Sequence, residues 1–233
     1  MSAAGADPVP VRGAHLVVIA KAPVAGRVKT RLCPPYTPAQ AAMLAEAALE
    51  DTLRAVAATP AAARTLVLDP GPTSPTLLPG DIAVIGQRGE GLDRRIAAAL
   101  ADAYARCAAP IVLIGMDTPQ VTPDLLARAG RALSGGRAGA AYGPAADGGF
   151  WLLGLRRPDA TLVEGVPMSV PETGAAQRAR FVRAGLRVLD LPVLRDVDTA
   201  ADADAVAALA PKGAFAARLA TLRPHVEPEF ATW

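Results

Sequence analysis

Four cations crowd one loop-like segment, AKAPVAGRVKTRL at residues 20–32, directly after the apolar run HLVVIA. No Asp or Glu lies between Asp7 and Glu46, so no acid that is near in sequence neutralises them. Lysine ammonium groups and arginine forks are complementary to phosphate oxygens, and a glycine such as Gly26 lets a backbone approach a ligand closely. The sequence therefore predicts a phosphate-binding loop, with a solvated basic loop as the alternative. The predicted ligands are Lys21, Arg27, Lys29 and Arg31.

Carboxylates follow two later segments in positions that suit a divalent cation. Asp117 stands in IGMDTPQ, immediately after a strongly apolar run, and Asp196 and Asp198 stand in LRDVDTAAD. Mg²⁺ binds one or two carboxylates together with water and substrate phosphates. Helix capping is the alternative for each, most of all for Asp198, because Thr199 starts a helical pattern. We predict an Mg²⁺ or Mn²⁺ site formed by Asp117 and Asp198.

The segment GPAADGGFW contains a tight turn, Asp147-Gly148-Gly149. Paired glycines expose backbone N–H groups that can bind an oxyanion, here that of an acceptor substrate. An ordinary β-turn with Asp at its first position explains the same letters without a function. Both interpretations stay open at this point.

Short apolar runs alternate with helical patterns along the chain, and the continuously apolar runs are typical of strands buried on both faces. The expected strands are 15–20, 64–69, 81–86, 110–115, 138–143, 150–155 and 186–191. Helices are expected after the capping box Thr37 to Gln40, over 90–108, after Thr122, after a capping box Ser169 to Glu172, and over 200–210. In the first helix, Leu49, Leu53 and Val56 form an apolar seam, and Glu50, Asp51 and Arg54 are expected to face away from it.

This alternation predicts an α/β fold, a three-layer α/β/α sandwich. The short connection between 138–143 and 150–155 allows only antiparallel neighbours, so the sheet is expected to be mixed and mostly parallel. Ligands in such folds bind outside the carboxyl ends of the strands, where the cationic loop and the aspartates would meet. We expect one domain over 14–222, with tails at 1–13 and 223–233.

Composition excludes several classes of function. The net charge of +2 and the 4% aromatic content argue against a nucleic-acid partner. No apolar run approaches the ~20 residues of a membrane span, and the N-terminal segment lacks the pattern of a signal peptide. Cys33 and Cys107 are isolated, as in a reduced cytoplasmic protein. Neither His15 nor His225 has a nucleophile at a telling spacing, so a histidine-based hydrolase has no support.

Together, AKAPVAGRVKTRL, IGMDTPQVTPDLL, GPAADGGFWLLGL and LRDVDTAAD resemble the bacterial GT-A-like transferases, often called selenodomain-associated or uncharacterised glycosyltransferases. The resemblance runs from about residue 14 to 210. It extends more faintly to 2-phospho-lactate guanylyltransferase and to the molybdenum cofactor guanylyltransferase. Two departures matter: Met168 stands where the family usually has tryptophan, and KAPVAG replaces the guanylyltransferases' Gly-rich first loop, which leaves the base unassigned.

The resemblance implies a nucleotide-diphospho-sugar transferase fold that binds an NTP or an NDP-sugar with Mg²⁺ and a small-molecule acceptor. Lys21, Arg27, Lys29 and Arg31 would hold the phosphates, Asp117 and Asp198 the metal, and Asp147, Gly148 and Gly149 the acceptor. Lys29, Lys21 and Asp117 are the residues expected to act in catalysis.

The leading functional expectation is Mg²⁺-dependent transfer of a nucleoside monophosphate from an NTP to a small phosphorylated acceptor, with release of pyrophosphate. NDP-sugar-dependent glycosyl transfer is the alternative, because metal-dependent GT-A enzymes usually carry a DxD after the central strand, where this chain reads Gly-Met-Asp. A non-catalytic nucleotide-binding sensor is the third. The sequence leaves a homodimer open.

Overall fold

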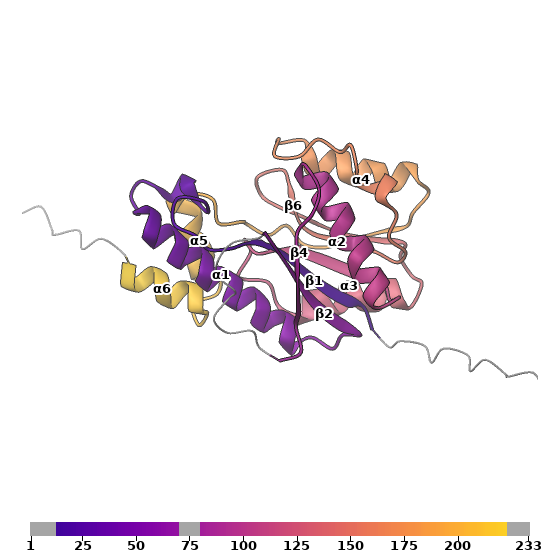
Figure 1. The fold of residues 1–233 in the computed structure, drawn as a ribbon, viewed down its shortest axis with the longest axis horizontal. Helices are drawn as coiled ribbons and strands as arrows, with labels where there is room; N and C mark the ends of the chain where they lie inside the picture. Colours follow the sequence, from indigo (N-terminus) through magenta and orange to yellow (C-terminus); the bar gives the residue numbers. More distant parts are fainter. Residues whose placement is uncertain (1–12, 70–79, 223–233) are drawn as a thin grey trace, which may run out of the picture.

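The computed structural model describes residues 13–69 and 80–222, and its frame is one seven-stranded sheet. The strands are β1 (His15–Lys21), β2 (Ala63–Asp69), β3 (Ala83–Gly86), β4 (Ile111–Gly115), β5 (Ala140–Pro144), β6 (Phe150–Leu155) and β7 (Val188–Asp190). They lie in the order β3-β2-β1-β4-β6-β5-β7, so β4 is the central strand and β1 lies next to it. Figure 1 shows the sheet running through the middle of the molecule.

Strand directions confirm the expected mixed, mostly parallel sheet. Strands β3, β2, β1 and β4 pair in parallel with one another, and β5 pairs in parallel with β7. Among these seven strands only β6 runs against the others, because it is antiparallel to both β4 and β5. The short turn between β5 and β6 explains this reversal, since a parallel crossover needs a dozen residues or more.

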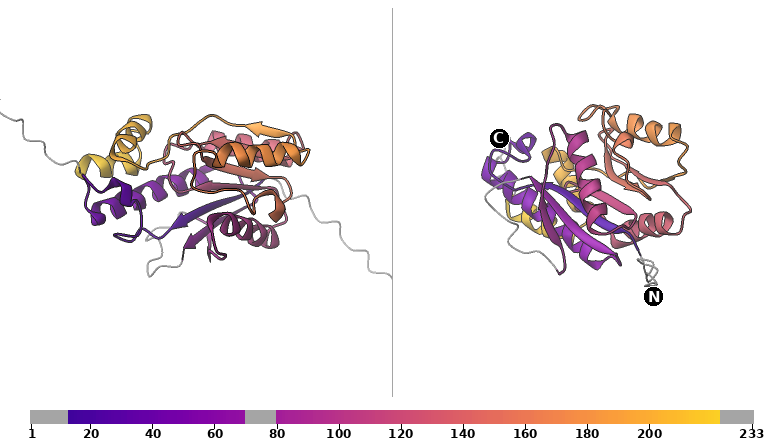
Figure 2. Two further views of the ribbon diagram at one scale, coloured as in Figure 1. Left: turned by 90° about the horizontal axis from the view of Figure 1, so that it is seen from above. Right: turned by 45° about the vertical axis from the view of Figure 1, so that its right-hand side comes forward.

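Helices cover both faces of the sheet and make the predicted three layers (Figures 1 and 2). The helices are α1 (Pro38–Ala58), α2 (Leu92–Arg106), α3 (Pro123–Ser134), α4 (Thr173–Arg183), α5 (Ala200–Leu209) and α6 (Ala214–Leu222), with 3-10 turns η1 (Thr30–Leu32) and η2 (Ala160–Leu162). Helices α1 and α3 bury Leu49 and Leu126 in one apolar cluster. Helices α2 and α4 bury Leu100 and Phe181 in a second cluster on the opposite face.

A third apolar cluster lies beyond the sheet, where α5 and α6 pack against α1 and η1. Its largest buried side chains include Leu32, Leu44 and Phe215, and Val197 contributes from the segment before α5. In Figure 1 the yellow helices α5 and α6 lie beside α1 at one end of the molecule. This cluster matters below because Leu32 and Val197 each lie next to a charged residue of the site.

The helix starts at Thr37, Thr122 and Thr199 were predicted correctly, and the one at Ser169 was not. Thr37 and Gln40 form the expected capping box of α1, and the Thr122 side chain accepts a hydrogen bond from Leu125 N at the start of α3. The Ser169 capping box is wrong, because α4 begins at Thr173. Val170 N instead donates to Thr173 Oγ1 at 3.2 Å, so the hydroxyl that stabilises this turn belongs to Thr173 and not to Ser169.

Asp51 is a second correction. It was expected to face away from the apolar seam of α1 together with Glu50, but it is 9% exposed. Its two carboxylate oxygens accept hydrogen bonds from Ala214 N and Phe215 N, each at 2.8 Å. These are orphan amides of the first turn of α6. Asp51 therefore caps a helix that begins 163 residues later, one that local sequence patterns did not predict.

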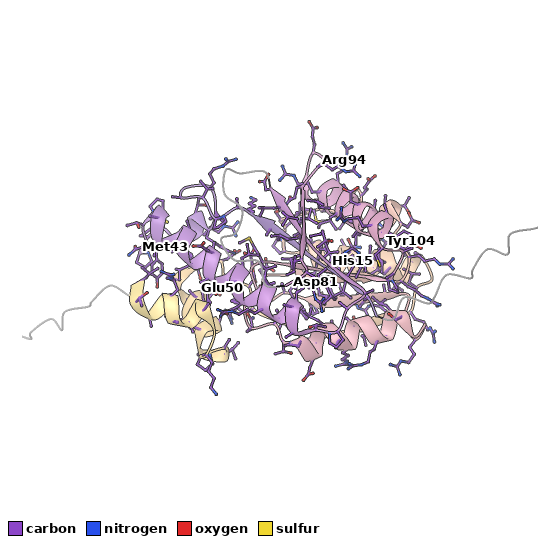
Figure 3. All side chains as sticks on the ribbon, turned by 60° about the horizontal axis from the view of Figure 1, so that its bottom comes forward. His15, Met43, Glu50, Asp81, Arg94 and Tyr104 are labelled. Carbon is purple, nitrogen blue, oxygen red and sulfur yellow. The ribbon has the colours of Figure 1, made fainter. Side chains whose placement is uncertain are left out.

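Three further sequence expectations concern membrane spans, His15 and the two tails. None of the helices in 13–69 and 80–222 has the length and hydropathy of a transmembrane span. His15 is fully buried at the start of β1, where its Nε2 lies 2.8 Å from Thr65 Oγ1 and burial lowers its pKa (Figure 3). The expected tails 1–13 and 223–233, and His225 with them, lie outside the described residues apart from Gly13.

Candidate active site

A cleft of about 660 Å³ opens at the carboxyl ends of β1 and β4, where the topology brings several loops together. The loop after β1, the residues after β4, the turn between β5 and β6, and the segment before α5 all line it. All nine predicted site residues except Gly148 contribute to its lining. The sheet therefore gathers the sequence motifs as expected from the general rule for α/β folds.

Lys29 lies at the centre of the charged part of this cleft. Its side chain is only 7% exposed, and its Nζ is 2.8 Å from Asp117 Oδ1 and 3.2 Å from Asp198 Oδ1. Burial alone would lower the pKa of Lys29, but the attraction of the two carboxylates outweighs burial and raises it. Lys29 also has a left-handed backbone, with φ 50°, which turns the chain into η1.

The other three cations of the loop are exposed. Arg31 Nη1 lies 3.2 Å from Asp198 Oδ2, with an arginine side chain that is 76% exposed. Among residues 13–69 and 80–222, no carboxylate lies within 4.0 Å of a Lys21 or Arg27 nitrogen, so their charge is available to a ligand. The lack of a nearby acid in the sequence is thus compensated at Lys29 and Arg31 by residues that are distant along the chain.

The segment 194–198 is fixed by backbone hydrogen bonds on both of its sides. Val197 N donates to Asp117 O at 3.0 Å, and Ala146 N donates to Leu194 O at 2.9 Å. Asp198 is therefore held against the residues after β4, and Asp196 against the turn after β5. Sequence patterns could not show this, because these contacts join loops rather than paired strands.

A carboxylate cluster results from this arrangement. Asp147, Asp196 and Asp198 each present an oxygen within 4.8 Å of the other two. Asp117 is not one of the three; its carboxylate pairs with Lys29, as does that of Asp198. The structure thus adds two residues to the predicted acidic part of the cleft. Asp147 was predicted to bind the acceptor, and Asp196 was named beside Asp198 but not predicted as a metal ligand. Oxygen donors at this spacing suit a hard divalent cation such as Mg²⁺ or Mn²⁺.

Asp196 is the most perturbed acid of the cleft. Burial raises its pKa to about 6, and the nearby carboxylates of Asp147 and Asp198 contribute to this rise against the opposing attraction of Lys29. A bound cation would offset the negative charge of the neighbouring carboxylates, so Asp196 would ionise more readily. The direction of this shift is what a metal-free acidic cluster should show.

The Asp147-Gly148-Gly149 turn uses its own amides. Gly149 N donates to Asp147 Oδ1 at 2.8 Å, and Gly148 N donates to Ala145 O at 3.2 Å. Gly148 also has φ 90°, which favours glycine. Both N–H groups are thus occupied within the turn, so an acceptor oxyanion would have to displace one of these bonds. The acceptor role of this turn stays a prediction.

Sequence reasoning missed several polar residues of the cleft. Arg95, from the first turns of α2, lines it with a nitrogen 3.8 Å from Asp69 Oδ2. Gln87 lines it too, and its Nε2 donates to Ala20 O at 2.8 Å, which ties the end of β3 to β1. Gln87 directly follows the expected strand 81–86, and this position was the available signal for it. Arg95 lies inside a helical pattern that gave no such signal.

The middle of the chain, which carries α2, β4 and the β5–β6 hairpin, matches a family of bacterial proteins. The family model described as "Uncharacterized protein conserved in bacteria (DUF2064)" covers residues 52–170. This chain belongs to the DUF2064 family. No curated protein sequence matches this DUF2064 protein.

Solved structures extend the comparison of this DUF2064 protein to the whole domain. A protein of Desulfovibrio desulfuricans G20 assigned as a nucleotide-diphospho-sugar transferase is 27% identical, with a TM-score of 0.78, covering 89% of this chain and 94% of that one. The CMP:2-keto-3-deoxy-manno-octonic acid synthetase structure, a complex with CTP, is 15% identical, with a TM-score of 0.54, covering 85% and 98%. The 2-C-methyl-D-erythritol 4-phosphate cytidylyltransferase of Thermus thermophilus is 20% identical, with a TM-score of 0.52, covering 85% and 98%.

These likenesses confirm the resemblance to the GT-A-like transferases and the fold class. The DUF2064 protein has the fold of nucleotide-diphospho-sugar transferases. At 15% and 20% identity, the synthetase and the cytidylyltransferase are similar to it in fold alone.

Proposed function

We propose that the domain 14–222 is a divalent-cation-dependent nucleotidyltransferase that acts on an NTP and a small phosphorylated acceptor. The observation that carries this proposal is the meeting of Lys29, Asp117 and Asp198 in one cleft with Lys21 and Arg27, which no carboxylate pairs in the described chain. Fixed cations and carboxylates around an open cleft suit a substrate of high negative charge whose reaction develops more charge.

In the proposed reaction, a phosphate oxygen of the acceptor attacks the α-phosphorus of the NTP. A new P–O bond forms, the bond between the α-phosphorus and the bridging oxygen breaks, and that electron pair leaves with pyrophosphate. Phosphoryl-group displacement of this kind depends on positioning and charge stabilisation more than on covalent help from the protein. The chain's part in it is therefore electrostatic.

Lys21 and Arg27 are proposed to bind the β- and γ-phosphates, since both are exposed at the cleft and lack acidic partners among the described residues. Lys29 is proposed to stabilise the charge that builds on the leaving pyrophosphate. Its two carboxylate partners keep it protonated and fix its direction, so little reorganisation is needed when the substrate binds. Arg31 bridges from Asp198 toward solvent and would complete the phosphate site.

Asp198 is proposed as a ligand of Mg²⁺ or Mn²⁺, together with Asp196 and Asp147, while Asp117 stays paired with Lys29. The sequence had predicted Asp117 and Asp198 as the metal ligands, and the present proposal keeps only Asp198 of these two. When bound, the cation would neutralise substrate phosphate charge. Asp117 would keep its role in catalysis by positioning Lys29.

Glycosyl transfer from an NDP-sugar is the second candidate. The similarity to a protein assigned as a nucleotide-diphospho-sugar transferase favours it, as does the position of the Asp196-Val197-Asp198 sequence in the cleft. A non-catalytic nucleotide sensor would keep the same binding residues but release no product. Cytoplasmic location and the oligomeric state remain expectations from the sequence.

The test is product analysis. The protein is incubated with each NTP, and separately with a panel of NDP-sugars, in the presence of Mg²⁺ or Mn²⁺ and phosphorylated acceptors. Release of pyrophosphate from an NTP, dependent on an acceptor, is expected. Release of free NDP from an NDP-sugar would replace the first candidate by the second, and nucleotide binding without either product would leave the sensor.

A further inference from the structure

Ser169 has a backbone conformation that serine rarely adopts. Among residues 13–69 and 80–222, only Lys29 and Ser169 are non-glycine residues with a positive φ, at 50° and 60°. Both line the cleft. A left-handed backbone is unfavourable for a residue with a Cβ, so it persists only where the surrounding structure enforces it, and such residues gather at ligand-binding sites. Lys29 has a role in the proposed function, and Ser169 has none.

Hydrogen bonds hold the chain on both sides of Ser169. Val170 N donates to Thr173 Oγ1 at 3.2 Å, and Thr173 N donates back to Val170 O at 3.0 Å. In the preceding stretch, Gly165 N donates to Asp93 Oδ2 at 2.9 Å, which joins it to the first turn of α2. Ser169 thus lies between two fixed stretches, and its left-handed backbone connects them.

The turn that follows Ser169 packs directly on the Asp147–Gly149 turn. Gly174 N donates to Gly148 O at 2.8 Å. A Cβ added to Gly148 would overlap Pro171 O, and one added to Gly174 would overlap a carbonyl oxygen of the Asp147–Gly149 turn. This close approach explains why glycine is needed at both positions. It also brings Ser169 to the side of the cleft that the sequence assigned to the acceptor.

The hydroxyl of Ser169 is available to a ligand. Ser169 is exposed in the cleft, and its side chain makes no hydrogen bond to any residue in the described ranges. The amides of Gly148 and Gly149, by contrast, are occupied within their own turn. The sequence attributed acceptor binding to those amides, and the structure offers a hydroxyl beside the same turn instead.

We propose that Ser169 is an acceptor-binding residue whose hydroxyl donates a hydrogen bond to a phosphate oxygen of the acceptor. The inference rests on the proposed function, because it names a residue that binds the second substrate in the same cleft. It uses none of the four cations after β1, which the NTP would occupy. Asp147, in the turn on which the Ser169 turn packs, is a proposed ligand of the divalent cation, so the acceptor phosphate would lie beside the charge that compensates it.

The experiment titrates methyl phosphate, a minimal phosphate monoester, into the intact protein by calorimetry. The protein is first saturated with Mn²⁺ and inorganic tripolyphosphate, which is expected to occupy the cationic loop without requiring a particular nucleobase. Ser169→Ala removes the hydroxyl and should weaken methyl phosphate binding about tenfold or more, the usual effect of losing a hydrogen bond to a charged group. The affinity for tripolyphosphate should not change.

Ser169→Gly separates the role of the hydroxyl from that of the backbone. It should bind methyl phosphate as weakly as Ser169→Ala, but it should unfold at a temperature about 2–4 °C higher, because glycine adopts a positive φ without strain. Ser134→Ala is the matched control, since Ser134 is exposed at the end of α3 and does not line the cleft. It should bind both probes as the wild type does.

The inference is overturned if the wild type does not bind methyl phosphate, if Ser169→Ala or Ser169→Gly binds it with wild-type affinity, or if these two variants are equally stable. If Ser169→Ala weakens the binding of tripolyphosphate instead, the hydroxyl binds the NTP and the acceptor assignment is wrong. Failure of the wild type to bind tripolyphosphate would count against the nucleotidyltransferase proposal alone. Methyl phosphate binding to the Mn²⁺-loaded variants would then still decide the role of Ser169.

Discussion

Lys29 Nζ lies 2.8 Å from Asp117 Oδ1, so the buried cation of the first loop is paired with the first acid after the central strand β4. Asp198 shares the same ammonium at 3.2 Å. A lysine held this way cannot rotate freely toward solvent, and its charge points at one place in the cleft. This pairing makes Lys29 a preorganised group rather than a mobile surface charge.

Replacing Lys29 by alanine should abolish turnover and leave the fold intact. Loss of one preorganised charge that stabilises the transition state commonly lowers the rate by about 10²-fold or more. Asp117 and Asp198 are 44% and 30% exposed, so water can solvate them after the lysine is removed. Pyrophosphate release and cooperative thermal unfolding measure the two effects.

Lys212→Ala is the matched control, because Lys212 is an exposed lysine that does not line the cleft. It should retain wild-type turnover. Unchanged pyrophosphate release by Lys29→Ala, next to an active Lys212→Ala, would contradict the proposed role.

Binding of Mn²⁺ should stabilise the protein through the carboxylate cluster. A ligand that binds only the folded state raises the free energy of unfolding by RT ln(1 + [L]/Kd), about 2.7 kcal/mol at a hundredfold excess over Kd. We expect Mn²⁺ to raise the Tm of the wild type, and Asp198→Asn and Asp147→Asn to lose this increase.

Asp117→Asn decides between the two metal assignments. If Asp147, Asp196 and Asp198 form the site, Asp117→Asn keeps the increase in Tm with Mn²⁺. If it loses the increase while Asp147→Asn keeps it, the sequence-based pair of Asp117 and Asp198 is correct and the cluster is not the site.

The raised pKa of Asp196 predicts a pH dependence of stability. Its pKa is about 6 in the folded protein against 3.8 as the reference, so the folded state binds the extra proton between these values. Folding stability therefore falls as pH rises from about 4 to 6, and the penalty is fully present above pH 6. With EDTA present, Asp196→Asn should be more stable than the wild type at pH 7.5 and equal to it near pH 4.

The size of this effect is modest because Asp196 is only half-buried. A shift from 3.8 to about 6 corresponds to about 3 kcal/mol without screening, and exposure to solvent reduces it to about 1 kcal/mol. Urea titrations at pH 4 and 7.5 measure it. If Asp196→Asn is less stable than the wild type at pH 7.5, the ionised Asp196 carboxylate does not destabilise the folded protein.

Asp51→Ala should destabilise the fold by about 2–4 kcal/mol. It removes two hydrogen bonds from a buried carboxylate and leaves Ala214 N and Phe215 N without their acceptor. Glu50→Ala is the control one residue earlier, since Glu50 pairs with the exposed Arg54 and its loss should cost less than about 1 kcal/mol. Chemical unfolding compares them; equal losses would mean that the cap contributes little.

The parts of the fold that local patterns describe were predictable from the sequence. The seven apolar runs became seven strands, and Thr37 and Gln40 cap α1 as their types require. The capping box at Ser169 misled because Thr173, inside the same stretch, provides a competing hydroxyl. Asp51 misled because its partners belong to α6, which lies far along the chain and has no strong start signal of its own.

The site divides in a similar way. The rule that ligands bind at the carboxyl ends of strands was enough to bring Lys29, Asp117 and Asp198 into one prediction. The carboxylate cluster was not predictable, because it depends on Ala146 N and Val197 N, whose backbone bonds hold Asp196 and Asp198 between two loops. Such loop-to-loop bonds leave no periodic trace in a sequence.

The third apolar cluster holds Leu32, which follows Arg31, and Val197, which precedes Asp198. The oppositely charged Arg31 and Asp198 are thus both anchored by this apolar cluster, which covers neither face of the sheet. A smaller side chain in this cluster, for example at Phe215 on α6, would loosen the spacing between Arg31 and Asp198 although it lies away from the cleft. If the proposed function holds, substrate preference is open to tuning through α5 and α6, while the sheet and the charged groups of the cleft stay unchanged.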